Sequence, residues 1–327
     1  MLFLLGAGFN IDANHEAGPV HNPYYGNKID CEYPLVAEML QLCFGLDKLP
    51  ADMSIEQLFS DAKKKHDIGP MERLVDRLMQ ADEYLALKLA TSDTPNVYRR
   101  FFEKFSDAHF LTFNYDSLPE IYLHRKERWY PEDGYGVPVI TELRFGVSLP
   151  PGRVSTSLVL HLHGSACVFG DEFAILGNPF EEVAQLVHTE PRYAFDAHAM
   201  SGCFPHYGRA MFRTGFVRPE DRVIAPVPDK SEDLKQQFVR AAYARALPLV
   251  SNTGTLVSIG YSFNVLDKSS YRPILEALGQ SSDRTLLLVS PEANRVRERL
   301  WMEHPNIKIT SIEKTFGKWA ADSFRGI

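Results

Sequence analysis

Six short apolar runs recur along the chain, and helical patterns follow most of them. Within each run the apolar residues stand at consecutive positions, which is typical of strands that are buried on both faces. The runs occupy residues 2–5, 109–113, 157–162, 255–259, 285–289 and 306–310. Because helices separate these strands, the pattern predicts an α/β, Rossmann-like fold with a mostly parallel sheet and helices on both faces.

The segments between the runs carry apolar residues at helical spacing. Residues 231–247 begin with Ser, Glu and Asp, which suit a helix N-terminus, and residues 292–302 form a second amphipathic pattern. Residues 72–89 show the same spacing within the long stretch that joins the first two runs. That stretch is longer than one crossover needs, so we expect a helical insertion at about 45–107 between the first two strands.

Two further zones are irregular. Residues from about 129–156 and from about 165–222 are rich in Gly, Pro and aromatic side chains and are predicted as insertions without regular structure. The sequence contains no internal repeat and no low-complexity tail. We therefore expect residues 1–327 to form a single domain around one sheet.

Charge and cysteine content narrow the class of protein. The formal net charge is −7 and no basic stripe is present, which disfavours nucleic acid as the main partner. The 4 cysteines include no CxxC pair, as expected in a reducing compartment. The apolar N-terminus reaches Gly6 without a basic leader or cleavage site, and no stretch approaches the roughly 20 apolar residues that span a bilayer. We expect a cytoplasmic protein.

Glycines and polar residues stand where the predicted strands end. The four groups are Gly6-Ala7-Gly8, Asn114-Tyr115-Asp116, His163-Gly164 and Gly260-Tyr261-Ser262. In open α/β sheets this carboxyl edge is where ligands bind. Each group also has a purely structural interpretation, since a G-x-G suits a tight turn and Asp116 and Ser117 suit a helix cap.

Histidine and cysteine positions do not predict a metal site. His161 and His163 share one face of a strand, but no acid stands beside them in the sequence. His198, Cys203 and His206 have a loose metal-like spacing without a fourth ligand. No metal is therefore expected.

The segment Gly260-Tyr261-Ser262-Phe263-Asn264 offers a different chemistry. A G-x-S-x-G turn after a strand is the nucleophile elbow of α/β-hydrolases. Here Asn264 stands in place of the last glycine, and His304 is the only later histidine. The elbow is incomplete, and an esterase that uses Ser262 remains an alternative.

In their order, the motifs GAG, TFNYD, LHG and IGYSF resemble those of the sirtuin-like superfamily. They look most like the bacterial sirtuin-like NAD hydrolases of anti-phage defence, and the likeness runs from residue 2 to about 290. Two features depart from sirtuin deacylases, because the zinc ribbon is absent and FNIDANHEAGPVHNP replaces the G-I-P-D-F-R stretch. Asn10 also stands where a serine is usual. The resemblance therefore implies NAD recognition and cleavage rather than deacylation.

The resemblance implies roles for three catalytic residues. Asn114 would position the attacking water and the nicotinamide ribose, and His163 would act as the base. Asp116 would hold the nicotinamide carboxamide or order the loop, whereas His161 would pack behind the site. An amide suits the first task because its oxygen accepts and its NH2 group donates while it stays neutral.

The resemblance also implies a set of NAD-binding residues. Gly6, Ala7 and Gly8 would cradle the pyrophosphate, Gly260 and Ser262 would face a phosphate or the adenosine ribose, and Ser290 and Asn294 would lie near the adenine. The remaining members of the predicted pocket are Asn10, Thr112, Tyr115 and Gly164.

The predicted function is hydrolysis of NAD to nicotinamide and ADP-ribose, in a bacterial defence effector. NAD is then the substrate, and no separate cofactor is expected. We also expect a homo-oligomer and an activating partner protein, with no membrane contact. A non-catalytic NAD or ADP-ribose sensor is the main alternative.

Overall fold

A computed structural model describes residues 1–20, 31–50, 52–140, 154–170, 193–195, 223–227, 230 and 233–327. Its centre is a sheet of six strands that all run parallel, in the order β4-β2-β1-β7-β8-β9. The strands are β1 Leu2–Leu5, β2 His109–Thr112, β4 Val159–His161, β7 Thr255–Ile259, β8 Thr285–Val289 and β9 Lys308–Ile312. The predicted Rossmann-like α/β fold is confirmed, and the last strand begins two residues later than expected.

The side of the sheet to which the chain adds strands changes at the middle, between β1 and β7. Numbered along the chain, the six strands follow the order 3-2-1-4-5-6 of doubly wound folds. The chain adds strands to one side of β1 until β4 and then crosses to β7 on the other side. A crevice at the carboxyl ends of β1 and β7 is where this topology places ligands.

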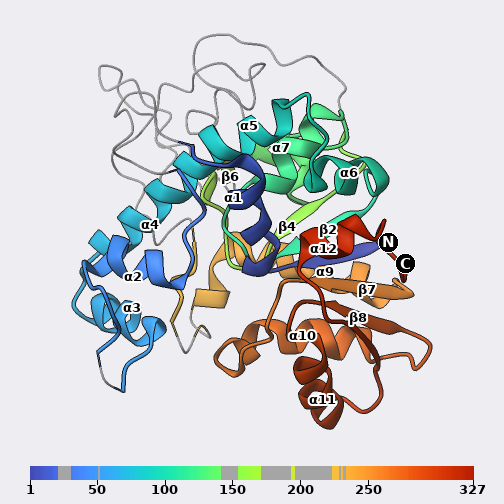
Figure 1. The fold of residues 1–327 in the computed structure, drawn as a ribbon. Helices are drawn as coiled ribbons and strands as arrows, with labels where there is room; N and C mark the ends of the chain where they lie inside the picture. Colours follow the sequence, from blue (N-terminus) through green and yellow to red (C-terminus); the bar gives the residue numbers. More distant parts are fainter. Residues whose placement is uncertain are drawn as a thin grey trace, which may run out of the picture.

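Alternate strand residues face two separate cores. Phe3 and Leu5 of β1 belong to one, packed with the helices of the N-terminal half and the C-terminal helix, while Leu2 and Leu4 belong to the other. The first layer contains α1 Ile11–Ala17, α6 Val97–Lys104, α7 Leu118–Arg125 and α12 Phe316–Ala321, and the second contains α9 Gln237–Ser251, α10 Lys268–Leu278 and α11 Ala293–Glu303. Figure 1 shows α10 and α11 on one side of β7 and β8 and α1, α6 and α7 on the other. The predicted helices on both faces are confirmed.

The segment between β1 and β2 is helical, as predicted. After η1 Ala7–Phe9 it contains α1, then α2 Val36–Phe44, α3 Ile55–Lys64, α4 Gly69–Gln80, η3 Ala81–Ala86, α5 Leu87–Thr91 and α6. Ser54 and Asn96 cap α3 and α6 by accepting hydrogen bonds from Gln57 and Arg99. Helices α4, η3 and α5 form one continuous run with a π-helical segment at η3. The boundaries 45–107 for the insertion stay a prediction.

The remaining elements are short. The chain forms α8 Pro131–Gly134, η8 Asp233–Lys235 and η9 Val265–Asp267, and a second sheet joins β3 Val139–Ile140, β6 Tyr193–Phe195 and β5 Val168–Gly170. These three strands lie in the zones predicted as irregular, most of whose other residues are outside the described ranges. The helix predicted over 231–247 begins at Gln237 and continues through Pro248. No helix in the described part of the chain has the length and apolar character to span a bilayer.

Candidate functional site

Two glycine-containing loops cross at the carboxyl ends of β1 and β7. The N–H of Gly8 donates to the carbonyl oxygen of Gly260 at 2.9 Å, and Gly260 has a φ of +65°. A Cβ on Gly8 would lie 2.8 Å from the Cα of Gly260, and one on Gly6 would lie 2.7 Å from the Cα of Tyr261. The glycines are therefore required by the crossing of the loops, and only Ala7 between them is exposed.

The amide of Asn114 lies against the first of these loops. Its Nδ2 donates to the carbonyl oxygen of Gly6 at 3.2 Å and to Oδ1 of Asn10 at 3.3 Å. The backbone N–H of Asn114 donates to Oγ1 of Thr112 at 3.0 Å, which holds the turn after β2. Asn114 is half-buried. The structure thus brings four of the predicted site residues together.

Asp116 joins this group from a buried position. Its Oδ2 accepts from Nδ2 of Asn10 at 2.6 Å, and its Oδ1 accepts from the backbone N–H of Leu118 at 3.1 Å. Burial raises the pKa of Asp116 to about 6, although the hydrogen bonds from Asn10 and Leu118 oppose the rise. Both carboxylate oxygens are engaged, which favours the loop-ordering role over contact with a carboxamide. Asp116 also caps α7, whereas the side chain of Ser117 makes no capping bond.

A fully buried ion pair supports the backbone of Asn114. Nε2 of His161 lies 2.6 Å from Oε1 of Glu120, and Nδ1 of His161 lies 3.1 Å from the carbonyl oxygen of Asn114. Burial lowers the pKa of His161, but the charge and hydrogen bond of Glu120 outweigh it, so the net shift is upward. The imidazolium form donates to both neighbours. His161 packs behind Asn114, in the position expected for it.

Two buried acids of this region, Glu120 and Asp82, were not predicted from the sequence. Asp82 is fully buried on η3, where it accepts from Oη of Tyr33 at 2.7 Å and from the N–H of Ser117 at 2.9 Å. Burial and then the charge of Asp116 raise the pKa of Asp82 well above its usual value. A signal was available, because Asp82 stands on the apolar stripe of its helix, at helical spacing from Leu78 and Leu85.

His163 faces a different element. Its Nε2 lies 2.8 Å from Oγ of Ser270 on α10, and its ring centroid lies 4.7 Å from that of Phe113. Burial, and then the charge of Lys230, hold the pKa of His163 well below its usual value, so the imidazole is neutral. No hydrogen bond joins His163 to Asn114 in the described residues. Its predicted role as a base is therefore not tested by this geometry.

Two other predicted residues organise the loop after β4. Oη of Tyr115 donates to the carbonyl oxygen of Ile224 at 2.7 Å. Gly164 has a φ of +83° and forms an antiparallel bridge with Val223. Both contacts attach the segment 223–227 to the ends of β2 and β4.

The predicted residues after β7 and β8 make separate contacts. Ser262 is exposed and its carbonyl oxygen accepts from Arg299 at 3.0 Å. The N–H of Ser290 donates to Ile312, and Oδ1 of Asn294 accepts from Oγ of Ser311 at 2.6 Å. None of these contacts reaches Asn114 in the described residues. Nor does a histidine bond to Ser262 there, so the structure adds nothing to the esterase alternative.

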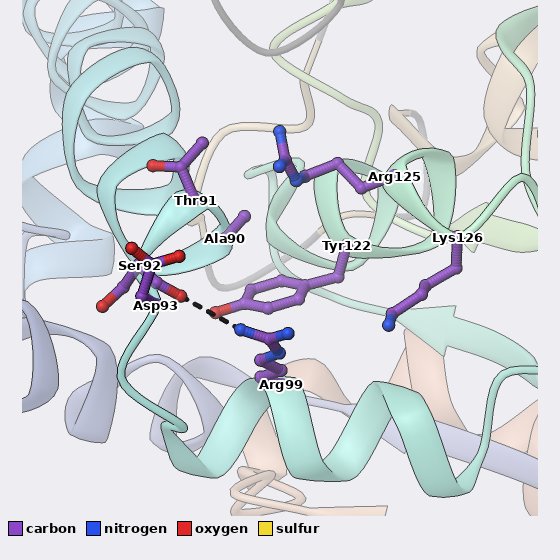
Figure 2. A pocket seen from close by; sticks show the side chains of 8 residues that line it. All are labelled: Ala90, Thr91, Ser92, Asp93, Arg99, Tyr122, Arg125 and Lys126. Carbon is purple, nitrogen blue, oxygen red and sulfur yellow. Dashed lines mark hydrogen bonds between the residues drawn. The ribbon is translucent and has the colours of Figure 1, made fainter.

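A polar pocket of about 210 Å³ lies elsewhere, between α5, α6 and α7. Figure 2 shows Arg99, Arg125 and Lys126 among its lining residues, with Arg99 bonded to the carbonyl oxygen of Ser92. None of the predicted site residues lines it. Arg99 and Lys126 also pair with Glu103, which neutralises part of the pocket's positive charge.

Within the described residues, no group of His, Cys, Asp and Glu side chains could hold a metal ion. The positions His198, Cys203 and His206, which have loose metal-like spacing, lie outside the described residues.

No protein-family model matches the chain, and no curated protein matches it. Two solved structures of a Sir2 homologue in complex with ADP-ribose, one a histidine-to-asparagine and one a phenylalanine-to-alanine mutant, have TM-scores of 0.41 and 0.42 and identities of 14% and 13%. Each match covers 99% of this chain and 90% of the other. A third solved structure, from work on the mechanism and regulation of Sir2 enzymes, has a TM-score of 0.36 and 12% identity, and the match covers 99% of this chain and 91% of that one.

Proposed function

We propose that this protein binds NAD at the carboxyl edge of its sheet and hydrolyses the bond between nicotinamide and ribose. One observation carries the proposal. The half-buried amide of Asn114 is anchored by hydrogen bonds at the switch point of a doubly wound sheet, next to the exposed Ala7 of the first glycine loop. This edge is where such sheets bind nucleotides.

The chemistry needs little from the protein beyond orientation and charge stabilisation. Nicotinamide leaves NAD as a neutral molecule from an already cationic ring, so no strong general acid is required. The site must orient the ribose, stabilise an oxocarbenium-like transition state and position water. The carbonyl oxygen of Asn114 would accept from the water or a ribose hydroxyl, and the neutral imidazole of His163 would accept the proton.

Incubation of the purified protein with NAD tests the proposal, with nicotinamide and ADP-ribose measured by mass spectrometry. Asn114→Ala and His163→Ala should each abolish nicotinamide release. Asn252→Ala removes an exposed asparagine at the end of α9 and should leave it unchanged. Wild-type turnover by both site variants would show that their roles are wrong. The incubation is repeated with candidate partner proteins, because we propose a defence effector that a partner activates.

One observation favours the sensor as a second candidate. The buried Nε2 of His163 is engaged by Ser270, and His163, the predicted base, makes no hydrogen bond to Asn114 in the described residues. A sensor would bind NAD or ADP-ribose in a calorimeter and release no nicotinamide under any activating condition. Nicotinamide release by the wild type that is lost in Asn114→Ala would exclude it.

A further inference from the structure

The NH2 group of Asn114 uses both of its hydrogens within the protein. One donates to the carbonyl oxygen of Gly6 and the other to Oδ1 of Asn10. An amide has two donor hydrogens, and its remaining polar atom is the carbonyl oxygen. Among the described residues nothing donates to Oδ1 of Asn114. That oxygen is therefore the group available for a ligand or water.

This orientation is not set by shape. The two ends of an asparagine amide have nearly the same size, so hydrogen-bonding neighbours decide which end faces which way. For Asn114 the neighbours are the Gly6 carbonyl, which can only accept, and Asn10, which can present either end. Asn10 accepts from Asn114 only because its own Nδ2 is turned toward Asp116 at 2.6 Å.

Asp116 is the fixed end of this series. An ionised carboxylate accepts and cannot donate, so it selects the Nδ2 end of Asn10. Its second oxygen is held by the N–H of Leu118 at the start of α7, and the residue is 2% exposed. Asn10 is 6% exposed, so water does not readily replace either partner. Asp116 therefore fixes the orientation of the Asn10 amide, and Asn10 in turn fixes the orientation of the Asn114 amide.

We propose that Asp116 is a positioning residue that, through Asn10, keeps the carbonyl oxygen of Asn114 turned away from Gly6 and Asn10 and available to a ligand or water. The effect of this positioning on kcat rests on the proposed function, the hydrolysis of NAD. With Asn10 reversed, Gly6 and Asn10 would favour opposite ends of the Asn114 amide, and the amide would lose its single preferred orientation. An NH2 group in place of that oxygen would repel the hydroxyl groups whose hydrogen bonds the oxygen accepts.

The exchange of two residues provides the decisive variant. In Asp116→Asn the N–H of Leu118 continues to select the oxygen of residue 116, which turns an NH2 group toward Asn10 and reverses it. Adding Asn10→Asp restores the series, because a carboxylate at position 10 accepts from both neighbours. We expect Asp116→Asn to lower kcat at least about tenfold with KM nearly unchanged, as for loss of one hydrogen bond to a charged group. The double variant should recover to within a few-fold of wild type.

A matched control separates positioning from general damage. Asp12 of α1 accepts from the N–H of Gly317 at 2.6 Å and makes no contact with Asn114 in the described residues. Asp12→Asn should leave kcat unchanged. The proposal is wrong if Asp116→Asn keeps wild-type kcat, or if the double variant is no more active than Asp116→Asn alone.

An NMR measurement tests the positioning without turnover. In protein labelled with ¹⁵N-asparagine, the side-chain amide signals of Asn10 and Asn114 should shift together as Asp116 is protonated, and Asp116→Asn should remove the shift. Four other titratable groups also face Asp116: Asp82 of η3, Glu120 of α7, His161 of β4 and Tyr98 of α6. The variant Asp82→Asn identifies any contribution of the Asp82 carboxylate.

The two proposals fail in different ways. Coupled amide shifts without nicotinamide release would reject the proposed function and retain the positioning role. Nicotinamide release with amide signals that do not respond to Asp116 would reject the positioning role alone.

Discussion

The two halves of the sheet end their strands in different ways. Beside the ends of β1, β2 and β4, hydrogen bonds join the buried side chains of Asn10 and Asp116 to the half-buried Asn114, and the buried pair His161–Glu120 holds the backbone of Asn114. After β7 and β8, Ser262 is exposed, and the charged pairs of α10 and α11 lie at the surface. One half therefore holds a preorganised polar network, and the other is an ordinary supporting layer.

The difference follows from the layer that covers one face of the sheet. The face of Phe3 and Leu5 is covered by the helices of the long segment between β1 and β2, together with α7 and α12. This layer delivers Asp82 from η3 and Glu120 from α7 to the back of the strand ends. The other face is covered by α9, α10 and α11, which supply apolar side chains to the second core. A thick layer on one face is what allows ionisable groups to be buried near the edge of the sheet.

The largest expected effect comes from breaking the buried ion pair. Glu120→Ala leaves the fully buried His161 without its partner, and loss of one member of a buried ion pair typically costs about 3–5 kcal/mol. Glu276→Ala breaks the pair with Arg272, whose N–O distance is also 2.6 Å but whose side chains are 62% and 53% exposed. That variant should lose about 0–1 kcal/mol. Urea unfolding of both proteins checks the comparison, and equal losses would contradict it.

The next largest effect concerns the pH dependence of stability. The pKa of Asp116 rises on folding from 3.8 to about 6, so the folded protein binds this proton more tightly than the unfolded chain. The stability that Asp116 contributes is fully present below pH 3.8 and is lost as the pH rises through 6. As the pH rises across this window, the free energy of unfolding of the wild type should fall by about 3 kcal/mol relative to that of Asp116→Asn.

The exposed carboxylate of Asp283, in the other half of the sheet, should give stability the opposite dependence on pH. A hydrogen bond from Ser281 lowers the pKa of Asp283, so its contribution is present at higher pH and is lost as the pH falls. As the pH rises, the free energy of unfolding of Asp283→Asn should therefore fall relative to that of the wild type. Chemical denaturation at several pH values measures both differences. The same sign for the two variants would show that Asp116 is not a buried group with a raised pKa.

Much of the fold could be predicted from the sequence, because buried parallel strands produce continuous apolar runs. All six runs are strands of the central sheet, and residues 292–302 coincide closely with α11. The bounds 231–247 were wrong at both ends, since α9 begins at Gln237 and continues beyond Leu247 through Pro248 to Ser251. Hydrophobic spacing does not fix where a helix stops when the following residues also pack against the core.

The site could be predicted only in part. The strand-end positions of Asn114 and Asp116 follow from the run that precedes them, but their bonds to Asn10 join residues about a hundred positions apart. The burial of Asp82 had a signal in its helical spacing from Leu78 and Leu85, but Glu120 is inside a helical pattern where a charged residue normally indicates a solvent-facing position. The burial of Glu120 depends on which helix covers which strand, and local spacing does not contain that information.

A smaller effect is expected where the glycine loops cross. A methyl group on Gly8 would lie 2.8 Å from the backbone of Gly260, and relieving the overlap should cost about 1–3 kcal/mol. Gly254, in the turn before β7, has no positive φ, and a Cβ added to it would meet nothing within 4 Å. Gly254→Ala should be neutral or stabilise by up to about 1 kcal/mol, because it restricts the unfolded chain. Thermal unfolding separates the two, and similar melting temperatures would contradict the close crossing.

The smallest effect tests whether Asn294 of α11 contacts the ligand. Asn294→Ala and Ser311→Ala break the same hydrogen bond between α11 and β9, which is 2.6 Å long, so each should lose about 1 kcal/mol of stability. If Asn294 also serves as the predicted adenine contact, only Asn294→Ala should weaken ADP-ribose binding, by about fivefold for one hydrogen bond. Calorimetric titration of both variants measures this, and equal affinities would assign Asn294 to the packing of α11 alone.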